Sequence, residues 1–202
     1  MKIGCTRAIF FDLDGTPLHY TRAYRAILTD AIRTVEGEVR DEWIDTYNET
    51  FFDILMDCRP EPYRRAFATV GEDPDAEALV EALRTREVDA CQPPKNAEAD
   101  LARLGEDYKL GVLTNGVQEW QRHKLEAYNL AEYFDAVITS YDANGHKPDP
   151  EPFRLAEKRL PADDYAMVGD DDADIEGAQK AEWTAYRYHG QGFGDLPDAL
   201  TW

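Results

Sequence analysis

Residues 97–188 alternate between helix-like and strand-like segments, and this alternation is the strongest constraint on the fold. Each amphipathic stretch is followed by a short apolar run, and runs of this kind predict buried strands. The expected strands cover residues 109–113, 136–139, 165–168 and 183–188, after helices near 97–104, 117–128, 152–160 and 175–181. Strands that alternate with helices pair in parallel through right-handed crossovers. We therefore predict an α/β fold with a parallel sheet.

A further buried strand is predicted at residues 7–13 and is separated from the others by a long helical block. Apolar residues recur at three- and four-residue spacing from about residue 20 to 83, which predicts about four helices. Pro93 and Pro94 end this block, because proline removes a backbone donor and forces the preceding residue into an extended conformation. The simplest organisation is a helical insertion at residues 17–91 in a core formed by residues 1–16 and 92–202.

The net charge of the chain argues against one class of binding partner, nucleic acid. The 202-residue chain has 41 acidic and 22 basic side chains, for a net charge of −19. Such a surface repels phosphate backbones, so we expect no nucleic-acid partner. Self-repulsion on this scale suits a high-salt cytoplasm, although the charge could equally serve solubility alone.

Other features of the sequence predict a cytoplasmic protein without a membrane partner. The apolar run near the N-terminus is only four residues long, too short for a signal peptide, and no stretch is long enough to span a membrane. Three scattered cysteines argue against a disulfide framework. Nothing in the sequence indicates an oligomeric state.

Polar clusters follow three of the predicted strands, at residues 12–16, 114–116 and 169–174, and a fourth, at 146–150, precedes a helix. Ligands of open α/β sheets bind beyond the carboxyl ends of the strands. Phosphoryl transfer requires a nucleophile, a proton donor, charge neutralisation and hydrogen-bond donors to phosphate oxygens, and Mg²⁺ relieves the repulsion among carboxylates. Taken singly, each cluster is also typical of an ordinary turn or a solvated acidic loop.

The four clusters together resemble the ordered motifs of the haloacid dehalogenase-like hydrolase superfamily. The matching segments are Asp12-Leu13-Asp14-Gly15-Thr16, Leu113-Thr114-Asn115-Gly116, Lys147-Pro148-Asp149-Pro150-Glu151-Pro152-Phe153, and Val168-Gly169-Asp170 with Asp174-Ile175-Glu176-Gly177-Ala178. Their order and spacing span nearly the whole chain. The resemblance implies a Rossmann-like, doubly wound core with an all-helical cap inserted after the first motif.

The resemblance also implies roles for individual residues. Asp12 would be the nucleophile, Asp14 the general acid and base, and Lys147 the neutralising cation. Thr114 would bind the phosphoryl oxygens. Gly15, Thr16 and Asn115 complete the expected substrate-binding set.

A Mg²⁺ ion is implied as cofactor, held by Asp12, the backbone carbonyl of Asp14 and Asp170. The second carboxylate of the metal site is ambiguous among Asp171, Asp172 and Asp174, since the loop is unusually acidic. We favour Asp174, which keeps the GDxxxD spacing of the family.

These roles predict a Mg²⁺-dependent phosphatase that hydrolyses a small phosphorylated metabolite through an aspartyl-phosphate. A phosphomutase with the same nucleophile and a non-catalytic metal- or partner-binding module are alternatives. A 2-haloacid dehalogenase is disfavoured, because dehalogenases of this superfamily resemble a different pattern, without an acid at the place of Asp14 and without a metal. A phosphate ester needs a proton for its leaving group, whereas halide does not.

Overall fold

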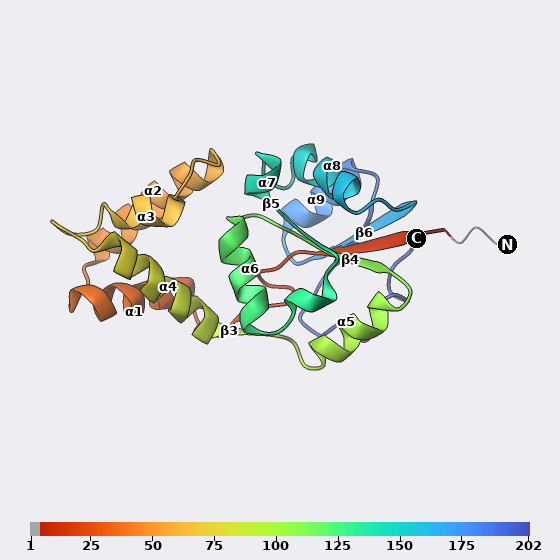
Figure 1. Cartoon of the computed structure of the whole chain (residues 1–202), viewed down its shortest axis with the longest axis horizontal. Coiled ribbons are helices and arrows are strands. Elements are labelled where there is room, and N and C mark those ends of the chain that lie inside the picture. Colours follow the sequence, from red (N-terminus) through yellow and green to blue (C-terminus); the bar gives the residue numbers. More distant parts are fainter. Residues whose placement is uncertain (1–4) are drawn as a thin grey trace. The chain divides into compact units, whose positions relative to one another are not determined.

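A five-stranded parallel sheet forms the centre of the larger of two units (Figure 1). The computed structural model describes residues 5–202. The strands are β1 Arg7–Phe11, β4 Lys109–Thr114, β5 Ala136–Thr139, β6 Asp164–Gly169 and β7 Thr184–Arg187, in the spatial order β5-β4-β1-β6-β7. Every neighbouring pair is parallel. The α/β class and the Rossmann-like parallel sheet are confirmed.

Helices cover both faces of this sheet, so that it is doubly wound (Figure 1). They are α5 Ala97–Gly105, α6 Gln118–Ala127, the short 3-10 helix η1 Ala131–Tyr133, α7 Ser140–Ala143, α8 Pro150–Arg159 and α9 Asp172–Lys180. Side chains of β1 alternate between the faces. Ile9 and Phe11 pack in one core with α5 and α6, while Ala8 and Phe10 pack in the other with α8 and α9.

The second unit, Tyr20–Gln92, is inserted between β1 and the rest of the sheet. Its helices are α1 Tyr24–Glu36, α2 Asp41–Met56, α3 Pro62–Phe67 and α4 Ala76–Ala90. The segments that connect it to the larger unit contain β2 His19–Tyr20 and β3 Cys91–Gln92, which form a two-stranded sheet. Gly37 ends α1 in a left-handed conformation, and Pro62 occupies the first turn of α3, as their backbone preferences predict.

Several element boundaries differ from the sequence-based prediction. Helix α9 begins at Asp172 rather than near residue 175, because the Asp171 side chain caps it by accepting a hydrogen bond from the Ala173 amide. Helix α8 begins at Pro150, since proline suits the first helical position. Strand β7 is shorter than predicted. In residues 5–202 no helix combines the length and apolar character that crossing a membrane requires.

Candidate active site

A cavity of about 260 Å³ lies at the carboxyl edge of the sheet. Strands β1, β4 and β6 end at this edge because they run parallel, and each is followed by polar residues. The lining residues are Asp12, Asp14, Thr114, Asn115, Lys147, Asp170, Asp171, Ala173 and Asp174. The structure therefore brings residues of all four sequence motifs to one cavity.

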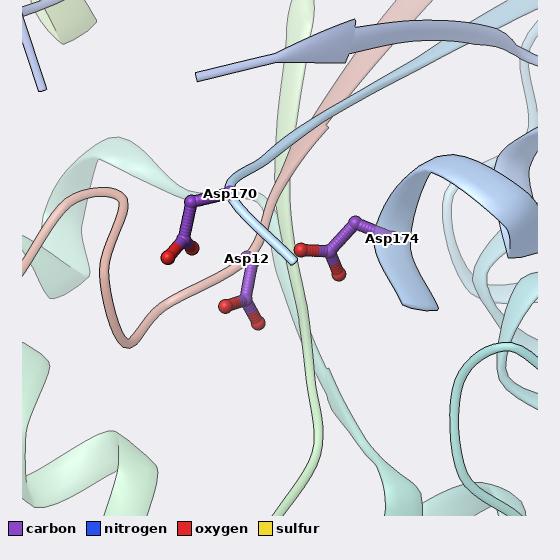
Figure 2. Close-up of side chains that lie close together, drawn as sticks. All are labelled: Asp12, Asp170 and Asp174. Carbon is purple, nitrogen blue, oxygen red and sulfur yellow. The ribbon is translucent and has the colours of Figure 1, made fainter. Parts of the chain in front are cut away.

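Three of the aspartates form a cluster in which the carboxylates face a common space (Figure 2). Asp12 follows β1, Asp170 follows β6, and Asp174 lies in the first turn of α9. One oxygen from each lies within 4.8 Å of the others. Hard divalent cations prefer oxygen ligands, so the donor set suits Mg²⁺.

Lys147 supplies the positive charge at the floor of the cavity. Its buried ammonium group donates to Asp12 Oδ1 at 2.7 Å, Asp174 Oδ1 at 2.5 Å and the Leu113 carbonyl oxygen at 2.7 Å. Burial alone lowers the pKa of an amine, but the carboxylates of Asp12 and Asp174 outweigh it and raise the pKa of Lys147. Lys147 therefore remains a cation in the folded protein.

The electrostatics disfavour ionisation of the carboxyl group of Asp12. Burial raises its pKa from 3.8 to about 6; Lys147 opposes this rise, and the negative charges of Asp174 and Asp14 add to it. Burial and the charge of Asp12 also raise the pKa of Asp170. A bound cation would reverse these effects by favouring the charged carboxylates.

The turn after β1 brings Asp12 and Asp14 to the same cavity. Gly15 adopts φ +91°, and a Cβ atom there would lie 2.3 Å from Asp170 Oδ2, so the loops after β1 and β6 can approach this closely only with glycine. The buried hydroxyl of Thr16 donates to Asp170 Oδ1 at 3.2 Å. Both residues, predicted to bind substrate, therefore lie beside Asp170 in this structure, and Thr16 donates a hydrogen bond to it.

Asn115 connects the loop after β4 to Lys147. Its Oδ1 accepts from the Lys147 backbone amide at 2.9 Å, and its Nδ2 donates to the Lys147 carbonyl oxygen at 3.3 Å. The next residue, Gly116, donates its amide hydrogen to the buried Ser140 hydroxyl at 2.9 Å. These bonds fix the Thr114-Asn115-Gly116 loop against the segment that carries Lys147.

The acidic loop after β6 separates its aspartates into different surroundings. Asp174 is only 1% exposed and joins the cluster, with its Oδ2 accepting from the Asp171 amide at 3.2 Å. Asp171 caps α9. Asp172 is exposed and pairs with Arg187 at 2.5 Å. Of these three aspartates, the structure places Asp174 beside Asp12 and Asp170.

Three residues at the site were not predicted from the sequence. Gln121 and Lys124, both on α6, contact the carboxylate of Asp14. Arg187, at the end of β7, donates to the Asp170 carbonyl oxygen at 2.8 Å. None belongs to the four sequence motifs, and the only signal in the sequence is the i, i+3 spacing of Gln121 and Lys124 on a predicted helix.

The fold and the cluster define an α/β protein with an acidic cavity at the carboxyl edge of its parallel sheet, and the sequence comparison gives its family. The haloacid dehalogenase-like hydrolase family matches residues 9–186 of the chain. The chain belongs to this family of hydrolases, which confirms the resemblance noted in its motifs.

The sequence identity between this chain and individual relatives is low. N-acylneuraminate-9-phosphatase of Homo sapiens is 25% identical over 201 residues, covering 90% of this chain and 81% of the human one. Phosphoglycolate phosphatase of Escherichia coli (strain K12) is 29% identical over 196 residues, covering 87% and 78%.

Solved structures share the fold. The HAD phosphatase of Thermococcus onnurineus has a TM-score of 0.68 and 25% identity, covering 96% of this chain and 97% of its own. The 2-haloacid dehalogenase of Pseudomonas syringae pv. Tomato DC3000 has a TM-score of 0.74 and 23% identity, with the same coverage. The fold thus serves both phosphatases and dehalogenases, and the side chains must decide between them.

Proposed function

We propose that this hydrolase is a Mg²⁺-dependent phosphatase that acts on a small phosphorylated metabolite through an aspartyl-phosphate on Asp12. The observation that carries the proposal is the presence of Asp14 beside the cluster of Asp12, Asp170 and Asp174 in one cavity. Phosphate-ester hydrolysis needs both an acid and charge neutralisation, whereas halide displacement needs no proton donor. The phosphatase relatives agree with this choice.

Five aspartates and a single lysine line the cavity, so a phosphate group would meet net repulsion without a cation. We assign Asp12, Asp170, Asp174 and the backbone carbonyl of Asp14 to a Mg²⁺ site. The metal, when bound, supplies positive charge that offsets the carboxylates and the phosphate oxygens. Lys147 adds a fixed charge at the same place.

In the first step the Asp12 carboxylate attacks phosphorus. The bond from phosphorus to the ester oxygen breaks, and the leaving oxygen takes a proton from Asp14, which gives the alcohol and an acyl phosphate on Asp12. Asp14 then removes a proton from water as that water attacks phosphorus. The bond from phosphorus to the Asp12 oxygen breaks, so that inorganic phosphate forms and both aspartates return to their starting state.

Thr114 and Lys147 hold the transferring group during both steps. Thr114 lines the cavity at the end of β4, and we assign its hydroxyl to the phosphoryl oxygens. The Lys147 ammonium counters the charge that develops there, an effect that is strong in a buried site. Hydrogen bonds between the Asn115 side chain and the Lys147 backbone hold these two segments together.

The test is release of phosphate from p-nitrophenyl phosphate and from a panel of phosphorylated metabolites, with Mg²⁺ or with EDTA, at low and at molar KCl. We expect Mg²⁺-dependent turnover that Asp12→Asn abolishes, because an amide cannot form the acyl phosphate. Activity of Asp12→Asn close to wild type would contradict the assignment. Chloride release from 2-chloropropionate without phosphatase activity would favour a dehalogenase, and isomerisation of a sugar phosphate without phosphate release would favour a phosphomutase.

A further inference from the structure

Two side chains of α6 donate hydrogen bonds to the carboxylate of Asp14. Lys124 Nζ donates to Asp14 Oδ1 at 2.5 Å, and Gln121 Nε2 donates to Asp14 Oδ2 at 2.9 Å. Each carboxylate oxygen therefore has its own donor. The rotation of Asp14 about its terminal bond is restricted from both sides.

The two donors come from a buried face of one helix. Gln121 and Lys124 are three residues apart and point the same way, and they are 3% and 2% exposed. Burying an ammonium group costs several kcal/mol unless a counter-charge is in contact, and Asp14 provides one. Leu125, fully buried in the core on this side of the sheet, anchors the helix.

Gln121 also ties Asp14 to the loop after β4. Its Nε2 lies 3.2 Å from Thr114 Oγ1 and 3.1 Å from the Asn115 carbonyl oxygen, in addition to Asp14. One amide group thus joins the residue assigned to proton transfer with the residue assigned to the phosphoryl oxygens. A shift of either segment would be transmitted to the other.

We propose that Lys124 and Gln121 are positioning residues that hold the Asp14 carboxyl group in the orientation for both proton transfers. The carboxylate paired with Lys124 is the form that takes a proton from water, and the protonated form gives it to the leaving oxygen. The inference rests on the proposed phosphatase function and adds two residues to its machinery. A general acid works only within hydrogen-bond reach of its target, and a side chain that is only partly buried would otherwise sample several rotamers. The hydrogen bonds from Lys124 and Gln121 reduce this freedom before substrate binds.

The experiment compares wild type with Lys124→Met on substituted phenyl phosphates, from p-nitrophenyl to p-methylphenyl. The poorer leaving groups depend most on the proton, so we expect kcat to fall at least about tenfold on p-methylphenyl phosphate but less than about twofold on p-nitrophenyl phosphate. KM and Mg²⁺ affinity should remain unchanged. Arg122→Met, on the exposed side of the same helix, is the matched control and should behave like wild type.

A double-mutant cycle separates positioning from a general structural role. If Lys124 acts through Asp14, Lys124→Met should cost nothing further in an Asp14→Asn background. Gln121→Met, which keeps the charge pair intact, provides a second variant and should show a smaller loss in the same direction. Equal losses on all leaving groups, or full additivity with Asp14→Asn, would overturn the proposal.

A structural measurement distinguishes failure of the positioning role from failure of the proposed function. In crystals of the wild type the Asp14 carboxylate should occupy one position against Lys124 and Gln121, and in Lys124→Met it should turn away or occupy several. If wild type hydrolyses no phosphate ester, the proposed function fails and the positioning role fails with it, even where the crystals show the hydrogen bonds to Asp14. If wild type is active but Asp14 keeps its place in Lys124→Met, only the positioning role fails.

Discussion

Asp12 is buried beside other aspartates, and Lys147 only partly offsets the free energy that its ionisation costs in the folded protein without a bound metal. Its pKa is raised from 3.8 to about 6. A carboxyl group whose pKa is higher in the folded state stabilises the fold at low pH, and this contribution is lost as the pH rises through the two values.

We therefore predict that Asp12→Asn stabilises the metal-free protein at pH 8 and does so less at pH 5. The neutral amide avoids the cost of a buried charge, and Lys147 keeps Asp174 and the Leu113 carbonyl oxygen as partners. Thermal unfolding in EDTA at the two pH values measures the effect. The prediction is wrong if the gain is the same at both, or larger at pH 5.

Asp170 and Asp172 follow the same strand but have different surroundings. The same substitution, to asparagine, can therefore be compared at both positions. Asp170→Asn should remove most of the increase in melting temperature that Mg²⁺ produces, since a ligand that binds the folded state stabilises it more, the more tightly it binds. Asp172→Asn should retain this increase, because Asp172 is exposed and faces Arg187 rather than the cluster. A larger loss in Asp172→Asn would move the metal site outward along the loop.

At the scale of elements, the last strand of the sheet contacts the loop after β6, which carries the proposed metal ligand Asp170. Arg187 on β7 donates a hydrogen bond from Nη1 to the Asp170 carbonyl oxygen at 2.8 Å and another from Nη2 to Asp172 Oδ1 at 2.5 Å. It thereby connects the backbone of Asp170 with the side chain of Asp172, on the two sides of Asp171. Groups that orient a metal ligand in this way commonly matter for affinity almost as much as the ligand itself.

Arg187→Met should weaken Mg²⁺ binding by about tenfold or more, while the fold is maintained by the remaining sheet contacts. Titration calorimetry with Mg²⁺ measures the change. Lys180→Met is a suitable control, because Lys180 lies at the exposed end of α9 and contacts Glu176 at 4.0 Å. Unchanged affinity in Arg187→Met would show that the loop holds its shape without β7.

The sequence predicted the strands and the four polar loops because both depend on local signals. Apolar runs mark the strands, and the turn residues that follow mark the loops at their ends. The contributions of α6 could not be predicted in the same way. Asp14 lies 107 and 110 positions from Gln121 and Lys124, and their pairing depends on how α6 rotates against the sheet.

The same limit applies to residues whose type was predicted but whose contacts were not. Thr16 and Asn115 lie at the site, yet their side chains contact Asp170 and the Lys147 backbone. A motif gives the residues that converge on a cavity. Which of them faces the ligand and which holds a neighbour depends on side-chain orientation, and that is settled by packing.

At the scale of the whole molecule, the dominant property is the net charge of −19. Many of the arginines are already paired with acids at the surface, for example Arg25 with Asp41 and Asp45, and Arg59 with Asp53. Each such exposed pair contributes little to the free energy of unfolding. The remaining acids repel one another over distances that dissolved salt controls, since the screening length falls from about 10 Å at 0.1 M to about 3 Å at 1 M.

We predict that the melting temperature rises between 0.05 and about 2 M KCl, most steeply in the lower part of the range, where screening changes fastest. Salt also strengthens apolar burial in any protein, so a less acidic variant is needed as control. Six exposed acids without an ion pair in the described residues can be changed to their amides: Glu72, Asp73, Glu106, Asp107, Glu126 and Glu132. This variant should melt higher at low salt and gain less from KCl. If it gains as much as wild type, the salt effect arises from apolar burial, and the acidity then serves solubility rather than adaptation to a high-salt cytoplasm.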